Sequence, residues 1–183
     1  MILIFIYLLS ILNLQAKSEN ELGLSFSSLS GAGINYNREL NSKFNLELNS
    51  FYFYLGNKPP KVYDTYFNIG GEVQYNIIKN SNNRFYSFIG SSYWNINQNY
   101  VVQIPVVNGS PKEENRIKSH SILNYGFGVG NEFRVLNDFS LSFSILYQFQ
   151  NLKNSSLNNF LDRNPKGDFY QGFGFGVSFR YKF

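Results

Sequence analysis

The sequence predicts an all-β protein, an antiparallel eight-stranded transmembrane β-barrel of meander topology that follows an N-terminal signal peptide. Three observations support this fold class. Apolar and polar residues alternate with a period of two in most of the chain. Aromatic residues make up 19% of it, yet the mean hydropathy is −0.25. Connections between alternating segments are short and long in turn, as in barrels with tight periplasmic turns and larger external loops.

The chain begins with an apolar run, Met1 to Ala16, that closes on a small residue and is followed by polar Lys17. This predicts a secretory signal peptide over residues 1–16, cleaved after Ala16. A membrane-anchoring helix is the alternative, but the run is shorter than the roughly 20 residues that span a bilayer. Residues 17–183 then form one barrel domain. The chain has no cysteine, so neither disulfides nor thiolate metal sites are available.

The first alternating segment, Leu22 to Arg38, allows two interpretations. It forms either one long strand or two short strands joined at Leu29-Ser30-Gly31, a three-residue hairpin loop with glycine in its last position. Topology favours the hairpin. If the short turns and both termini lie on one side of the membrane, a further strand is needed, and the total becomes eight, an even number as usual.

Six further strands follow in order. They are expected at 44–55, 64–77, 85–100, 123–135, 139–150 and 169–183, with long connections at 56–60, 101–119 and 151–168. The segment Val101 to Val107 is a candidate extension of a hairpin beyond the membrane. In the strand over 85–100, the clearest apolar face consists of Tyr86, Phe88, Trp94 and Ile96, and we expect this face to meet lipid.

The last strand alternates without interruption from Phe173 to Phe183, with glycine, serine, arginine and lysine between the apolar residues. Phe179, Tyr181 and the terminal Phe183 resemble the C-terminal signal of bacterial outer-membrane β-barrel proteins. The whole mature chain resembles small barrels of the OmpX, OmpW and OmpA-barrel kind. This resemblance implies recognition by the barrel-assembly machinery and location in the outer membrane of a Gram-negative-type envelope.

The faces opposite the apolar ones carry glycines and charges of both signs. An eight-stranded barrel is about wide enough for its side chains to fill the lumen. We therefore expect a hydrogen-bonded ionic plug toward the periplasmic end, which implies little or no conductance. Its predicted members are Glu47, Glu72, Glu132, Arg134 and Arg180.

The sequence offers no convincing catalytic, cofactor or metal site. Some outer-membrane barrels are lipid A acyltransferases or deacylases with His and Ser near the rim, and His120 is the only histidine here. Ile122 stands where such a deacylase would carry serine, and no orienting acid is aligned. Gly126 to Gly130 superficially resembles a nucleotide-binding loop, but it lies within a strand and opens no helix. The net charge of +4 is dispersed, so nucleic acid is not an expected partner.

We therefore expect a non-enzymatic, monomeric outer-membrane barrel that contributes to envelope integrity and, through its external loops, to surface interaction. Its partners would be outer-membrane lipid and lipopolysaccharide. One alternative is a narrow porin for small or apolar solutes. Another is a soluble periplasmic lipocalin-like barrel that binds lipid and directs its apolar face inward.

Overall fold

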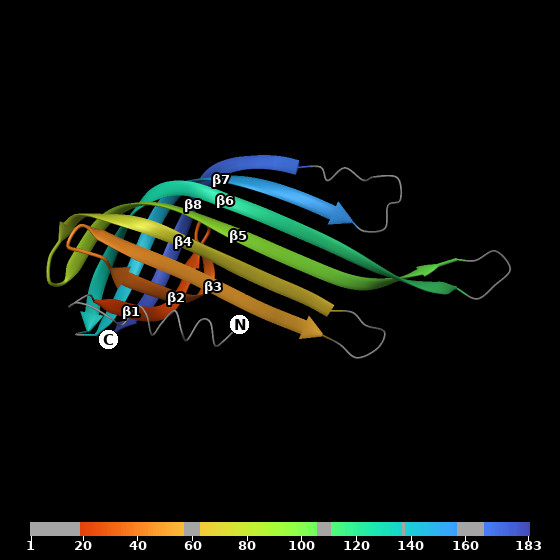
Figure 1. Ribbon diagram of the computed structural model, residues 1–183, viewed down its shortest axis with the longest axis horizontal. Coiled ribbons are helices and arrows are strands. Elements are labelled where there is room, and N and C mark those ends of the chain that lie inside the picture. The colour runs from red at the N-terminus through yellow and green to blue at the C-terminus, as the bar shows by residue number, and fades with distance from the viewer. Residues whose placement is uncertain (1–18, 57–62, 106–110, 137, 157–166) are drawn as a thin grey trace.

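The computed structural model describes residues 19–56, 63–105, 111–136, 138–156 and 167–183, so the predicted signal peptide lies outside the described residues. Eight antiparallel strands form one closed barrel in which each strand pairs with its sequence neighbours and β1 pairs with β8 (Figure 1). This confirms the predicted fold class. The strands are β1 (Asn20–Ser27), β2 (Gly31–Glu39), β3 (Phe44–Gly56), β4 (Tyr63–Lys79), β5 (Asn83–Ile104), β6 (Lys112–Leu136), β7 (Phe139–Ser156) and β8 (Gly167–Lys182).

The first alternating segment is a hairpin, as the topology predicted, and β1 and β2 pair from Asn20 with Arg38 up to Ser27 with Gly31. The tip is built by local chemistry. The hydroxyl of Ser27 accepts hydrogen bonds from the backbone N–H groups of Leu29 and Ser30, at 3.2 Å each. Gly31 then adopts a φ of 101°, which a residue with a side chain rarely adopts. The chain therefore turns sharply after only eight residues of β1.

The hairpin of β5 and β6 continues past the strands predicted at 85–100 and 123–135, and it includes the candidate extension from Val101 as far as Ile104. Its pairing continues to Ile104 opposite Lys112, so most of the connection expected at 101–119 consists of strands. The β-branched residues Val101, Val102 and Ile104 favour extended backbone, and each strand supplies the other with hydrogen-bond partners. As Figure 1 shows, this hairpin projects beyond all the other strands.

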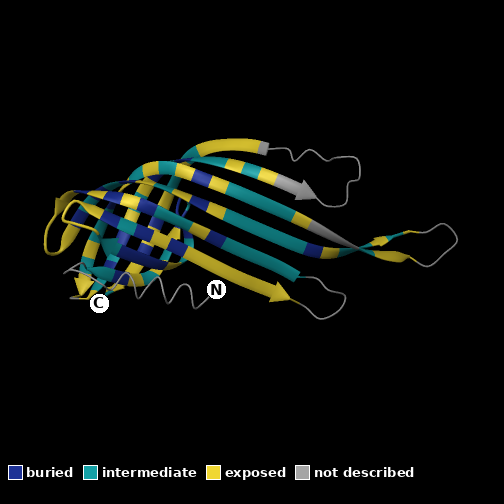
Figure 2. Ribbon diagram, in the orientation of Figure 1, coloured by how far each residue is buried: buried dark blue, intermediate teal, exposed yellow. Residues whose placement is uncertain are grey.

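The barrel presents its apolar side chains to the outside. Ile145, Phe175 and Phe127 are 66%, 59% and 54% exposed, whereas Asn49, Gln74 and Arg180 on inward-facing positions are at most 1% exposed. Figure 2 shows the resulting alternation of buried and exposed residues along the closed part of the barrel. This is the surface of a barrel that crosses lipid, and it is the reverse of a lipocalin, whose apolar face lines the lumen. No helix among the described residues is long and apolar enough to cross a membrane.

The lipid-facing assignment predicted for Tyr86, Phe88, Trp94 and Ile96 of β5 is wrong, because the unbroken register places all four on the inward face. Tyr86 and Phe88 point into the lumen and are only 2% and 3% exposed, opposite Asn76 and Gln74 of β4. Both faces of this strand carry apolar residues, such as Phe85 and Ile89 on the outside, so the period of two alone did not identify the lipid-facing side.

The strands differ greatly in length, from eight residues in β1 to 25 in β6. The ring is therefore closed only in its lower part. Pairing of β2 with β3 ends at Ser50, and pairing of β1 with β8 ends at Gly176. Beyond these points the sheet is open, with β3 at one edge and β8 at the other (Figure 1).

Candidate functional site: the filled lumen

The lower lumen is organised around Arg180 of β8, whose side chain is completely buried. Its Nη1 donates to Glu47 of β3 at 2.8 Å, and its Nη2 donates to Glu132 of β6 at 2.6 Å. The Nε atom forms an ion pair with Glu21 of β1 at 3.2 Å. One guanidinium thus joins three carboxylates from three other strands, using the planar set of donors that distinguishes arginine from lysine.

Arg84 of β5 supplies the second cation of this cluster. Its Nη2 lies 2.6 Å from the same Glu132 oxygen that Arg180 contacts, and its guanidinium lies 4.6 Å from the centre of the Tyr86 ring. Two guanidinium groups therefore face the carboxylates of Glu21, Glu47 and Glu132. Because the cluster is removed from water, each charge depends on its partners for stabilisation.

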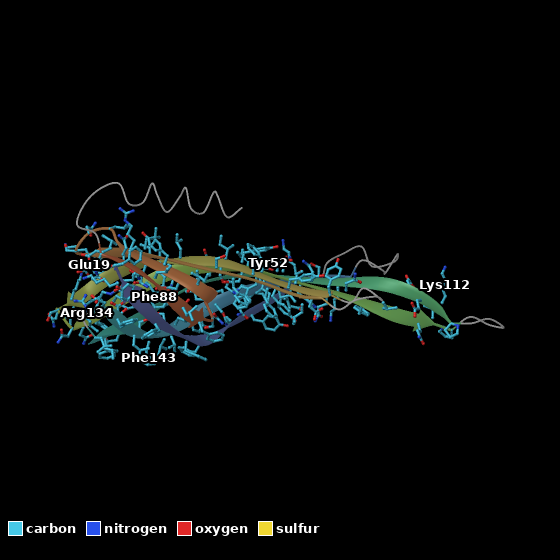
Figure 3. All side chains as sticks on the ribbon, turned by 90° about the horizontal axis from the view of Figure 1, so that it is seen from below. Glu19, Tyr52, Phe88, Lys112, Arg134 and Phe143 are labelled. Atoms are coloured by element: carbon cyan, nitrogen blue, oxygen red, sulfur yellow. The ribbon has the colours of Figure 1, made fainter. Side chains whose placement is uncertain are left out.

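The structure brings together three of the five residues predicted for the plug, Glu47, Glu132 and Arg180. Glu72 lies beside them and accepts a hydrogen bond of 3.4 Å from Gln74, which also donates to Glu47 at 2.8 Å. Arg134 was predicted in the same cluster but lies at the lower rim, where it pairs with Glu19 at 3.5 Å. Figure 3 shows Glu19 and Arg134 at the end of the molecule opposite Lys112.

Glu21 and Arg84 belong to the cluster but were absent from the prediction. Glu21 precedes Leu22, so the alternation in β1 already places it on the inward face. Arg84 shares the face of Tyr86 and Phe88, and the incorrect lipid-facing assignment of those two residues concealed it. The register that places Arg84 opposite Glu132 across β5 and β6 is seen only in the structure.

Neutral amides extend the cluster through the lower lumen. Asn37 donates to Gln74, Asn45 donates to Asn37, and Asn76 donates to Asn45, at 3.3, 3.0 and 3.0 Å. Higher up, Asn49 donates to Ser30 at the tip of the β1–β2 hairpin at 2.8 Å. A connected hydrogen-bond network thus links the ionic cluster to the hairpin tip.

An apolar layer lies in the lumen at the level of this tip. Leu29, which is fully buried, packs with Tyr86, Phe88 and Leu146, none of which is more than 3% exposed. The tip fits because small residues face it: a Cβ on Gly70 would lie 2.1 Å from the carbonyl oxygen of Ser30. The lumen is consequently filled by polar contacts below and by the Leu29 layer above.

The predicted assembly signal lies on the outer surface. Phe179, Tyr181 and Phe183 are 50%, 46% and 58% exposed. Phe139 of β7 stacks on Phe179 with ring centres 5.4 Å apart and contacts Tyr181 at 5.2 Å. These side chains are accessible from outside the barrel, and their role as a signal remains a prediction.

His120 lies on β6 opposite Ile96 of β5, in the upper part of the barrel and away from the ionic cluster. Within the described ranges, no three or more histidine, aspartate or glutamate residues are grouped in a way that would hold a metal ion. The side chains that the structure gathers most closely are those that fill the lower lumen.

Comparison with solved structures agrees with the fold. The chain is similar to the crystal structure of a major outer membrane protein from Thermus thermophilus, with a TM-score of 0.51 and 9% identity over 92% of this chain and 100% of that one. A weaker similarity is to CarO2 from Acinetobacter baumannii, with a TM-score of 0.43 and 8% identity over 90% of this chain and 98% of that one. No protein-family model matches the chain, and no curated protein sequence matches it. The first similarity supports the barrel fold alone.

Proposed function

We propose that the protein is a non-enzymatic outer-membrane β-barrel that is sealed against solutes and contributes to envelope integrity and surface interaction. The observation that carries this proposal is the filled lumen. Arg180, its three carboxylate partners and the Leu29 layer occupy the space through which a solute would pass.

Location in the outer membrane follows from the chemistry of the two faces. Hydrocarbon requires an apolar exterior and a closed set of backbone hydrogen bonds, and the closed part of the barrel has both. The fold shared with an outer-membrane protein supports the same location. Membrane lipid, lipopolysaccharide and the barrel-assembly machinery are then its partners. The small number of strands favours a kinship with the OmpX, OmpW and OmpA-barrel kind.

The surface role belongs to the end of the barrel opposite the start of β1 and the end of β8. The β5–β6 hairpin projects from this end, with Lys112 and Glu113 exposed near its tip. A paired hairpin holds its side chains in a fixed array at little entropic cost, which favours recognition of an external partner.

Conductance in a planar lipid bilayer tests the sealed lumen. The wild-type protein should insert without producing stable unitary current steps. A variant with Arg180→Ala, Glu47→Ala and Leu29→Ala removes part of each layer and provides the open control, with its folding checked by the change in electrophoretic mobility on boiling. Stable single-channel steps from the wild type would contradict the proposal and favour the narrow porin.

A further inference from the structure

The barrel wall has a side opening above the β1–β2 hairpin. We define it as the gap between the unpaired edge of β3 from Phe51 to Gly56 and the unpaired edge of β8 from Gly167 to Gly174. Ser28 closes it from below, because its backbone N–H donates to the carbonyl of Phe175 at 3.1 Å. The opening exists because β1 and β2 are the two shortest strands.

The chemistry of β3 changes at the residue where β2 leaves it. Below Ser50 the inward face of β3 carries Asn45, Glu47 and Asn49, all buried in the polar network. Above Ser50 the same face carries Phe51, Phe53 and Leu55, which are 41%, 43% and 54% exposed. Inward-facing aromatic side chains with this much exposure show that the upper lumen is open beside β3.

The neighbouring strands carry further apolar residues on this inner face, together with polar Asn68 of β4 and His120 of β6. In register, Asn68, Trp94 and Ile122 lie opposite Phe51 in successive strands, and Tyr66 and Ile96 lie opposite Phe53. The indole of Trp94 is on the inward side, since its Nε1 donates to the buried Ser92 hydroxyl at 3.1 Å. We call Phe51, Phe53, Tyr66, Trp94, Ile96 and Ile122 the inner patch.

The lipid-facing surface reaches the height of the side opening. Phe173 of β8 lies beyond the last residue that pairs with β1, is 83% exposed and contacts Tyr147 with ring centres 5.3 Å apart. Tyr52, on the outward face of β3, is 61% exposed beside the same opening. Exposed aromatic side chains therefore lie on both faces of β3 and on the outer face of β8 at the height of the side opening.

We propose that the inner patch binds one acyl chain of an outer-leaflet lipid, which enters through the side opening while the headgroup stays outside. This rests on the proposed outer-membrane location. Below the patch, Ser92 and Asn124 form a polar floor joined by a hydrogen bond of 3.1 Å, and Leu29 fills the lumen beneath. These residues would direct the acyl chain along the sheet and keep it out of the lower lumen. Backbone groups that are unpaired in hydrocarbon are costly, so the proposal requires that water from the open upper end reach the edges of β3 and β8.

Trp94 is the only tryptophan in the chain, so intrinsic fluorescence reports on the inner patch directly. The full chain is reconstituted into phosphatidylcholine vesicles whose acyl chains carry bromine, a quencher that acts at short range. We expect strong loss of Trp94 fluorescence, close to that of an outward reporter made by Ile89→Trp with Trp94→Phe. A lumen reporter below the floor, Phe88→Trp with Trp94→Phe, should lose little. Tyr86→Trp replaces it if that variant does not fold.

A pair of variants tests the patch itself. Phe51→Asn with Phe53→Asn makes the inner face polar and should reduce quenching of Trp94 by brominated lipid. Ile69→Asn, on the outward face of β4 away from the opening and 52% exposed in the wild type, should leave it unchanged. Trp94 that is quenched by aqueous iodide but not by brominated lipid would overturn the acyl-chain site and indicate a water-filled opening. An unquenched Ile89→Trp reporter would instead refute the membrane placement on which the site depends.

Discussion

Arg180 Nη1 and Glu47 Oε2 lie 2.8 Å apart across the lumen, joining β8 to β3, although the two residues are 133 positions apart in the chain. The strands β1 and β2 separate β8 from β3 in the barrel wall, so backbone pairing does not connect them. This contact therefore joins the two strands that flank the short β1–β2 hairpin. It also occupies the lower lumen, where the ring of strands is closed.

Replacing Arg180 should strongly destabilise the barrel. Arg180→Gln leaves Glu21, Glu47 and Glu132 buried without their shared cation, and such a change costs about 3 to 5 kcal/mol. Urea unfolding in lipid vesicles measures the loss. Adding Glu47→Gln and Glu132→Gln should restore part of it, since the uncompensated charges are removed. As a control, Lys182→Gln at the rim, where the side chain is partly exposed, should cost under about 1 kcal/mol. Equal stability of Arg180→Gln and wild type would contradict the shared-cation arrangement.

Leu29 should contribute as a core residue although it lies in a turn. Leu29→Ala removes a fully buried side chain from the layer with Phe88 and should cost about 2 to 5 kcal/mol of unfolding free energy. Leu24 lies on the lipid-facing side of β1 in the same hairpin and is 66% exposed. Leu24→Ala is therefore the matched control and should cost less. If both variants lose the same stability, the tip of the hairpin does not insert into the lumen.

Two glycines test how closely the hairpin tip fits. A Cβ at Gly70 would lie 2.1 Å from the Ser30 carbonyl oxygen, a backbone atom that moves only with the whole tip. Gly70→Ala should therefore cost about 1 to 3 kcal/mol. A Cβ at Gly172 meets nothing within 4 Å, and Gly172→Ala should change stability by less than about 0.5 kcal/mol. The urea midpoints of unfolding of the two variants measure these losses. A larger loss for Gly172→Ala than for Gly70→Ala would contradict the position of the hairpin tip.

Glu19 at the lower rim gives a pH dependence. Partial burial raises the pKa of Glu19, but the ion pairs with Lys182 and Arg134 outweigh it, so the pKa is lowered overall. The stabilisation is present above the unfolded pKa of about 4.3 and is lost as pH falls through the lower folded value. The stability difference between wild type and Glu19→Gln should thus be present at neutral pH and disappear in acid. A difference that persists well below the unfolded pKa would contradict this assignment.

The barrel and its strand number were predictable because the alternation of residues such as Phe173 and Gly174 directly reflects the two faces of a strand. Which face of β5 points to the lumen was not predictable, because both of its faces carry apolar residues. Only the pairing of Tyr86 with Asn76 determines which side meets the lumen. The buried position of Leu29 depends on the Ser27 turn and the space beside Gly70, and no local pattern encodes that combination. Arg84 was missed for the same reason as Tyr86.

The central claim is that the apolar faces of these strands meet lipid around a filled polar lumen. Electrophoresis in sodium dodecyl sulfate of the detergent-extracted outer-membrane fraction, unheated and boiled, tests it most directly. A closed barrel should resist unheated detergent and change mobility on boiling, and the protein should stay in the membrane after an alkaline wash. Identical mobility in both samples, with the protein released into the periplasmic fraction, would contradict the claim.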